Sequence, residues 1–218
     1  RKLIEARYFC DHYQSDGDPS LLFSPHDYSG HGTHTLATTG GNFVPGASSC
    51  GLAYGIASGG APRARVASYK VLWPDDKGGH TSYDQDIMNA YDATINDEVD
   101  VLSVSMGDEY PDRKYSYDGS YRSSFKAVAN GIVVVKSAGN YGPDPKTLVN
   151  CEPWVITVAG SLCLVYIFSG WFSSAPIIFT AHLTCLCLGS MDGEKSSIVH
   201  RLSRHDPYFV GQDQVVLF

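Results

Sequence analysis

Short apolar runs and segments with helically spaced apolar residues alternate along the first three quarters of the chain. The runs "ARVASYKVLW", "VDVLSVSMG", "IVVVKSAGN" and "WVITVAG" are bounded by Gly, Pro, Asn or Asp, which predicts buried strands. Between them, "SYDQDIMNAYDATIN" places Ile87, Ala90, Tyr91, Thr94 and Ile95 on one face of a helix. This alternation predicts an α/β fold, a three-layer doubly wound arrangement with a mostly parallel sheet.

Two further segments predict helices. The small residues of "GHGTHTLATTGGN" indicate a helix that approaches a neighbouring segment too closely for bulky side chains. "SYRSSFKAVANG" predicts a helix with Phe125, Val128 and Ala129 inward and Gly131 at the stop position. "GLAYGIASGGAP" predicts a Gly/Ala-rich turn, and residues 8–25 predict a polar surface loop.

Residues 162–188 interrupt this pattern with an apolar stretch that contains no charged residue. The stretch is long enough for the roughly 20 residues that span a bilayer. Gly170, Pro176 and His182, with several Ser and Thr, would interrupt a uniform helix, so we do not expect a membrane span. Beyond Val199 the tail is polar and unpatterned, and we expect it to be poorly ordered.

Charge and cysteine content exclude some function classes and leave others open. The 218 residues include 23 acidic and 16 basic side chains, a net charge of −7, so we expect no nucleic-acid partner. The six cysteines form no CxxC pair or paired metal-ligand spacing and do not fix the redox compartment. The start "RKLIEARYF" has no Met and no signal-like segment, which we interpret as an internal piece of a longer chain. There is no Asn-x-Ser/Thr sequon.

The most specific text is "DYSGHGTHTLAT", which continues through "GNFVPGAS", "GIASGGAPRARVASYKVLW", "DIMNAYDATINDEVDVLSVSMG", "FKAVANGIVVVKSAGNYGP" and "PWVITVAG". In this order the motifs resemble the subtilisin-like serine proteases, plant subtilases in particular, over about residues 1–160. The resemblance implies a subtilisin-like fold, a secreted serine-type endopeptidase, a polypeptide substrate and no cofactor.

The resemblance assigns the catalytic histidine to His31, at the start of a helix. A neutral imidazole there can take the proton from a serine hydroxyl and return it to the leaving amine. His34, one helical turn later, matches a structural histidine of the family. Without the resemblance, His31 would be interpreted as an ordinary helix-terminal histidine. The HxxH pair is also compatible with a metal site, but no acidic or Cys partner follows at helix spacing, so we expect none.

The resemblance also assigns roles to two strand ends. In the family, the residue at Asn140 donates its amide to the oxyanion that develops in the tetrahedral intermediate. The three residues before it form a pocket wall, and the end of another strand pairs with the extended substrate backbone. Taken alone, each Gly and Ser among these residues would indicate only a tight turn. The candidate substrate-binding residues are Ser105, Met106, Gly107, Ser137, Ala138 and Gly139.

Two of the three catalytic groups of the family have no match in this sequence. The family's Asp lies in an Asp-Thr-Gly or Asp-Ser-Gly strand end, and its nucleophile lies in Gly-Thr-Ser-Met-Ala; neither motif occurs here. Asp11, Asp16, Asp18 and Asp27 precede His31 but lack the strand context. Since the three groups act as a unit, we expect the chain as written to be inactive.

The segment 189–199, "GSMDGEKSSIV", resembles family text that normally follows the strand "WVITVAG". We therefore divide the chain into a partial catalytic domain (1–161), an apolar insertion of doubtful origin (162–188), and a short resumed family segment with a tail (189–218). The insertion hypothesis includes untranslated sequence read through in a gene model. Glu98 departs from the family, which usually has Gly there, where a helix ends and a positive φ is easiest.

Two other hypotheses stay open. One is a catalytically dead subtilase-like protein that binds peptides or regulates, and the other is a membrane-tethered variant that uses residues 162–188. Substrate preference and oligomeric state cannot be predicted from these residues. A sheet without its first strand exposes unpaired edges, so we expect poor solubility of the chain expressed alone.

Overall fold

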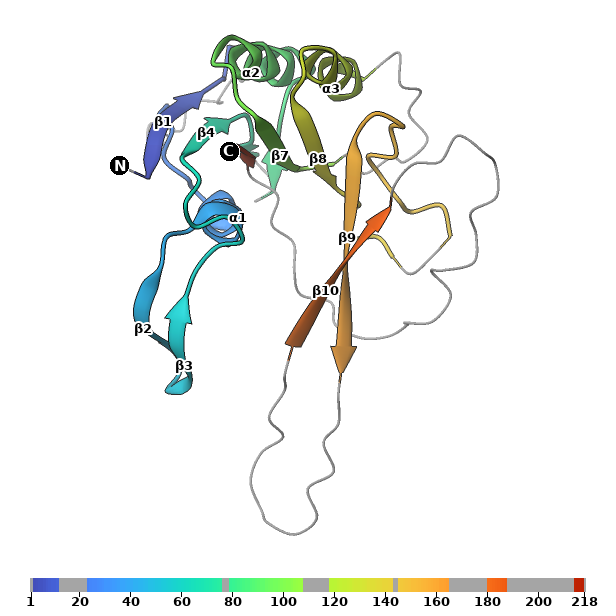
Figure 1. Ribbon diagram of the computed structural model, residues 1–218. Helices are drawn as coiled ribbons and strands as arrows, with labels where there is room; N and C mark the ends of the chain where they lie inside the picture. Colours follow the sequence, from blue (N-terminus) through green and yellow to red (C-terminus); the bar gives the residue numbers. More distant parts are fainter. Residues whose placement is uncertain are drawn as a thin grey trace.

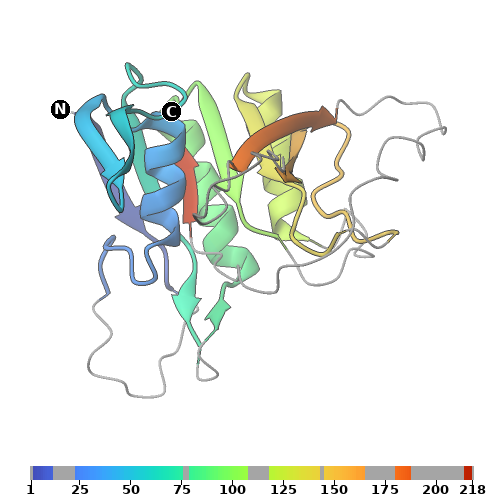
Figure 2. The ribbon, with the colours of Figure 1, turned by 90° about the horizontal axis from the view of Figure 1, so that it is seen from below.

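The computed structural model describes residues 2–11, 23–75, 79–107, 118–142, 145–164, 180–187 and 214–217. A central sheet separates helix α1 on one face from helices α2 and α3 on the other, as the two views in Figures 1 and 2 show. The helices are α1 (His31–Gly40), α2 (Asp84–Asn96) and α3 (Gly119–Ala129). The strands are β1 (Leu3–Tyr8), β2 (Val44–Ser49), β3 (Leu52–Ala57), β4 (Val66–Lys70), β5 (Trp73–Pro74), β6 (His80–Thr81), β7 (Val101–Ser105), β8 (Val133–Ser137), β9 (Ile156–Leu164), β10 (Thr180–Cys187) and β11 (Gln214–Leu217).

The main sheet has seven strands in the order β1-β4-β11-β7-β8-β9-β10. β1 pairs in parallel with β4, and β7, β8 and β9 form a second parallel run. β11 lies antiparallel to both β4 and β7, so those two strands point the same way. β10 pairs antiparallel with β9 at the edge. The prediction of an α/β fold with a mostly parallel sheet is confirmed.

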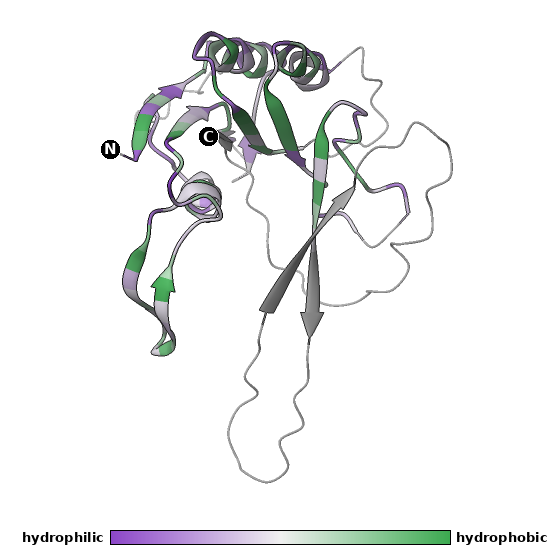
Figure 3. Cartoon of the chain, viewed as in Figure 1, coloured by the Kyte–Doolittle hydropathy of each residue, from purple (hydrophilic) through white to green (hydrophobic). Residues whose placement is uncertain are grey.

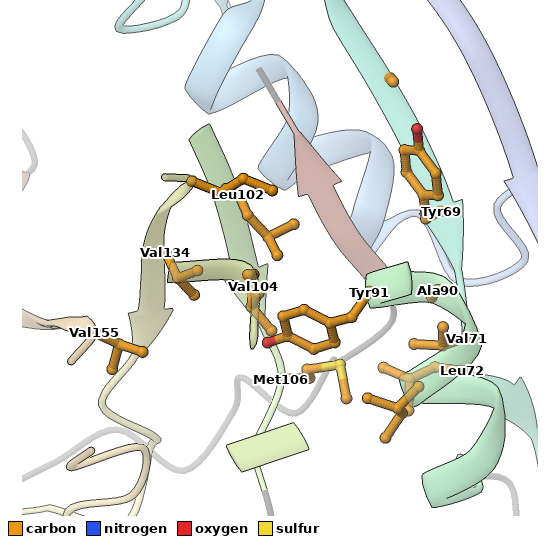
Figure 4. Packing of buried hydrophobic residues seen from close by; sticks show 14 residues of the cluster. Tyr69, Val71, Leu72, Ala90, Tyr91, Leu102, Val104, Met106, Val134 and Val155 are labelled. Atoms are coloured by element: carbon orange, nitrogen blue, oxygen red, sulfur yellow. The ribbon is translucent and has the colours of Figure 1, made fainter. Parts of the chain in front are cut away.

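The core lies between the sheet and the pair α2 and α3. It is built from alternate residues of β7 and β8, such as Leu102, Val104 and Val134, packed against Ala90 and Tyr91 of α2 (Figure 4). β7 and β8 are accordingly hydrophobic over most of their residues and hydrophilic toward their ends, where Lys136 and Ser137 close β8 (Figure 3). The predicted inward face of α2 is confirmed, since its core-facing residues are buried or partly buried.

The predicted inward face of α3 is wrong in two of its three residues. Phe125 is 57% exposed and Ala129 is exposed, whereas Val128 is partly buried. α3 instead turns a polar and aromatic face inward, with Tyr121, Ser123, Ser124 and Ala127 buried. Charged and polar groups beneath it favour this rotation: Ser120 accepts a hydrogen bond from Lys136, and Ser124 accepts one from the Trp154 indole at 3.0 Å. Gly131 has a φ of 86°, as its stop position predicts.

Part of the segment predicted to be a Gly/Ala-rich turn is instead strand β3, Leu52–Ala57, which pairs antiparallel with β2. The close approach predicted for α1 is confirmed just beyond its end. A Cβ on Gly59 would lie 2.3 Å from the Gly41 nitrogen, and the Gly59 amide donates to the Gly41 carbonyl at 2.9 Å.

Several sequence predictions fall on the last quarter of the chain or on loops. The strand β9 continues through residue 161 to Leu164, and β10 and β11 are strands that the sequence pattern did not predict. Most of the predicted surface loop (12–22), most of the apolar stretch (165–179) and the segment 189–199 lie outside the described residues. Within the described ranges, no helix combines the length and the apolar character needed to cross a bilayer.

Candidate functional site

Two Ser-x-Gly segments end neighbouring parallel strands at the same height in the sheet. β7 ends at Ser105 and β8 ends at Ser137, and the register pairs Val104 with Lys136. Met106 and Ala138, the next residues along each segment, are buried. Because the carboxyl ends of parallel strands collect the reactive groups in α/β sheets, this edge is the candidate site.

The segment 148–150 lies directly behind both strand ends. A Cβ on Gly107 or on Gly139 would lie 2.9 or 2.8 Å from the same methyl group, Cγ2 of Val149. Val149 also donates its backbone N–H to the Ala138 carbonyl at 3.1 Å. Both glycines are thus required by packing, and Gly139 additionally by its φ of 84°.

Asn150 joins the two strand ends through its side chain. Its Nδ2 donates to the carbonyl oxygens of Met106 and Ser137, each at 2.8 Å. The residue is 5% exposed and has a left-handed φ of 56°. Asn tolerates this conformation better than most residues, since its short polar side chain can hydrogen-bond locally.

A buried ion pair lies one residue before the second strand end. Lys136 Nζ is 2.5 Å from Glu152 Oε1, and neither side chain is exposed to solvent. The ammonium also donates to Ser120 Oγ at 3.0 Å and lies 5.0 Å from the centre of the Tyr121 ring. Buried charges are tolerated when paired and hydrogen-bonded in this way.

Asn140 follows the second strand end and is exposed. It comes directly after Ser137, Ala138 and Gly139, the last of which bends the chain at a positive φ.

The contacts of Val149 and Asn150 bring together five of the six candidate substrate-binding residues, and the sixth, Ser105, lies alongside at the end of β7.

His31 is the first residue of α1. This helix packs on β4 and β11, whereas the two strand ends belong to β7 and β8. Burial lowers the pKa of His31 below its usual 6.5; the nearby His34 and His80 act in the same direction, and Asp27 opposes them. Its imidazole is therefore in the neutral, proton-accepting form at pH 7. His34 is exposed.

Asp27 holds the start of α1. Its carboxylate accepts hydrogen bonds from the backbone N–H groups of Ser29, Gly30 and Thr33 at 3.1, 3.0 and 2.7 Å. Burial alone would raise the pKa of Asp27, but the hydrogen bond from the Thr33 side chain and these backbone bonds together outweigh it and hold the pKa below its usual value. Asp27 therefore caps the helix that carries His31.

Sequence reasoning missed several residues of the site. A lysine inside "GIVVVKSAGN" was a usable signal, because a charge in a buried strand requires a partner. Nothing in "TLVNCEPW" indicated that Val149 and Asn150 lie against two distant strands. Among the described residues, no group of three or more His, Cys, Asp or Glu side chains is placed to hold a metal ion. Asp16 and Asp18 lie outside the described ranges.

Comparison with known proteins matches residues 3–163 to the model of the subtilase family of peptidases. The chain is 52% identical over 164 residues to the subtilisin-like protease SBT5.4 and 50% over 163 residues to SBT5.3, both of Arabidopsis thaliana. It is 44% identical over 169 residues to the subtilisin-like protease Glyma18g48580 of Glycine max. Each match covers 74% of this chain and 21% of the relative. The chain therefore belongs to the subtilase family, and its similarity is to plant subtilisin-like proteases.

Proposed function

We propose that this chain is part of the catalytic domain of a serine-type endopeptidase whose substrate is a polypeptide. The observation that carries the proposal is the pair of Ser-x-Gly strand ends side by side at one sheet edge, within a continuous match to the subtilase family. An extended peptide can add to such an edge through its main chain, while pockets select its side chains.

Four roles follow for the residues at hand. His31 acts as general base toward a serine hydroxyl and then as general acid toward the leaving amine. Asn140, exposed beside the second strand end, donates its amide to the oxyanion of the tetrahedral intermediate. Ser105–Gly107 pairs with the substrate backbone, and Ser137–Gly139 forms a wall of the pocket for the side chain before the scissile bond.

The chemistry needs an Asp and a Ser that this sequence does not contain in the family's motifs. We therefore propose that the 218 residues as written are inactive, and that an active protein would take both groups from other parts of a longer chain. The relatives are about five times as long as the part matched here, which leaves room for them. The proposed longer protein is secreted, as plant subtilases commonly are.

The proposed division of the chain keeps a partial catalytic domain (1–161), an apolar insertion (162–188) and a resumed segment with a tail (189–218). Its support is that the family match ends at residue 163, close to the first boundary. β9 crosses this boundary, so the proposed insertion begins inside a strand.

A second candidate function is a catalytically dead subtilase-like protein that binds peptides. The 218 residues keep both strand ends of the peptide site, and this function needs only those segments. The two candidates share the peptide site and differ only in whether bond cleavage follows.

Long-read sequencing of the transcript, from its 5′ end to the stop codon, separates them. The endopeptidase is supported by upstream codons for Asp-Thr-Gly or Asp-Ser-Gly and downstream codons for Gly-Thr-Ser-Met-Ala. The encoded protein should then react with a serine-directed fluorophosphonate, and His31→Ala should abolish the labelling. A transcript that encodes these 218 residues alone, with an unreactive product that binds peptides, supports the binding protein.

A further inference from the structure

We propose that Asn150 is a positioning residue that sets the separation between the two candidate walls of the peptide site, Ser105–Gly107 and Ser137–Gly139. The inference rests on the proposed function, because it treats these segments as substrate-binding. It identifies a residue that determines which side chain the pocket accepts.

The backbone ladder between β7 and β8 stops before the two walls begin. The pairing of β7 with β8 ends with Val104 and Lys136, so the ladder does not join the residues beyond them. Beyond that point Asn150 connects the two segments. Its amide nitrogen has two protons and donates to the Met106 and Ser137 carbonyls at 2.8 Å each. One side chain thus bridges the two walls past the end of the sheet.

Asn150 is itself held in place by its neighbours. Thr157 donates its hydroxyl to the Asn150 carbonyl, and the preceding Val149 N–H bonds to Ala138 at 3.1 Å. Two residues later, Glu152 is anchored on Lys136 of β8. The bridge is therefore fixed at its base, so it transmits a defined spacing to the walls.

The spacing between the two walls controls which side chain fits between them. Val149 fills the volume behind Gly107 and Gly139, so neither wall can move back toward Val149. The two hydrogen bonds from Asn150 prevent the walls from separating. A pocket bounded in both directions discriminates between large and small apolar side chains. Loss of the bridge should reduce that discrimination more than it reduces general peptide binding.

The test measures peptide binding by the 218-residue chain with fluorescence anisotropy. The probes are fluorescein-labelled Ala-Ala-Ala-Phe and Ala-Ala-Ala-Ala. Asn150→Asp keeps the shape but has no donor, and Asn150→Gly removes the side chain; both residue types accept the left-handed backbone. Asn130→Asp, the same substitution at an exposed helix end whose amide bonds only Lys126, is the matched control.

We expect Asn150→Asp and Asn150→Gly to bind the Phe peptide about ten-fold more weakly, because the unbridged walls would adopt the binding-competent spacing only about a tenth of the time. The Ala peptide should lose less, so the Phe/Ala selectivity falls, and Asn130→Asp should change neither. Equal losses for both peptides, in proportion to the folded fraction, would show a purely structural role and overturn the proposal. A Phe/Ala selectivity that stays at the wild-type value in both Asn150 variants would also overturn the proposal.

Hydrogen exchange separates this inference from the proposed function. In Asn150→Gly, the backbone amides of both walls should exchange faster than in the wild type, whether or not a peptide binds. A wild-type chain that binds neither peptide refutes the proposed function, and faster exchange in both walls would still establish the bridge; unchanged exchange would overturn it. If the variants do not fold, the wild-type Asn150 side-chain amide decides: slow exchange supports the bridge, and exchange at the rate of an exposed amide refutes it.

Discussion

Lys136 and Glu152 form an ion pair at 2.5 Å with neither side chain exposed to solvent. The pair joins β8 to the segment that carries Val149 and Asn150, and so fixes the rear of the candidate peptide site. Two charges removed from water depend on each other, because much of the desolvation cost of each is offset by its partner.

Breaking this pair should be strongly destabilising. We expect Glu152→Gln to lower the free energy of unfolding by about 3–5 kcal/mol, since it leaves a buried ammonium uncompensated. The double variant Lys136→Met with Glu152→Leu should recover most of that loss. Urea unfolding of the wild type, Lys136→Met, Glu152→Leu and the double variant measures the coupling, with Glu152→Gln measured alongside. Asp92→Asn, which breaks the exposed pair with Lys126, is the control and should cost at most about 1 kcal/mol. A double variant no more stable than Glu152→Gln would contradict the prediction.

The two glycines behind the site should respond differently to added methyl groups. Gly107→Ala should cost about 1–3 kcal/mol through overpacking against Val149. Val149→Ala removes the methyl groups it meets, so the pair of changes should cost less than their sum. Gly139→Ala should stay costly even beside Val149→Ala, because its φ of 84° adds about 1–3 kcal/mol of backbone strain. Thermal unfolding of these variants measures each cost. Equal rescue of both glycine variants would show that packing alone matters.

Glu98 follows α2 at a left-handed φ of 53°. Glu98→Gly should stabilise the chain by about 0.5–1 kcal/mol, since Gly adopts this conformation without the strain that a side chain brings. Glu98→Ala keeps the strain and should give no such gain. Urea midpoints of the two variants distinguish the backbone effect from the loss of a charge, which both share.

The Asp27 cap should stabilise the helix that carries His31. We expect Asp27→Ala to cost about 1–2 kcal/mol, as for other helix caps, and Asp27→Asn, which retains one acceptor oxygen, to cost less. Because the folded pKa of Asp27 is lowered, its contribution is complete above the unfolded value of 3.8 and is lost as the pH falls through the folded value. Urea unfolding across acid pH tests both points. An Asp27→Ala variant with wild-type stability and acid sensitivity would refute the cap.

His31 should titrate below the ordinary histidine pKa of 6.5, because burial disfavours its charged form. On acidification the unfolded chain takes up this proton first, so the contribution of His31 to stability is complete above 6.5 and falls between 6.5 and the lower folded value. NMR titration of the imidazole signals gives the midpoint, and the signal missing from His31→Gln provides the assignment. A midpoint at or above 6.5 would show that burial does not dominate.

Helices and strands whose apolar periodicity matches their burial in the fold were predictable from the sequence. α2 and the strands β4, β7, β8 and β9 follow from local patterns, and so does the positive φ at Gly131. The inward face of α3 was not predictable, because Phe125 has the apolar character of a core residue but the buried Lys136 draws the polar face inward. Tertiary context decided that rotation.

The residues of the candidate site also divide into those that the sequence predicts and those that it does not. The residues at the two strand ends follow from family resemblance and strand position, but the supporting residues Val149, Asn150 and Glu152 do not. They lie at the strand ends only because a later segment folds back behind them. Such contacts depend on chain topology, which local sequence patterns do not encode.

The placement of β11 between β4 and β7 has a consequence for how the sheet assembles. Val215 pairs with both Tyr69 and Val104, so the middle of the sheet joins segments that are widely separated in the chain. Closing such large loops costs chain entropy before any pairing compensates for it, which makes folding slow. During synthesis, β4 and β7 must wait with facing edges open until residues 214–217 have been made, and that interval is when another strand could pair with them instead.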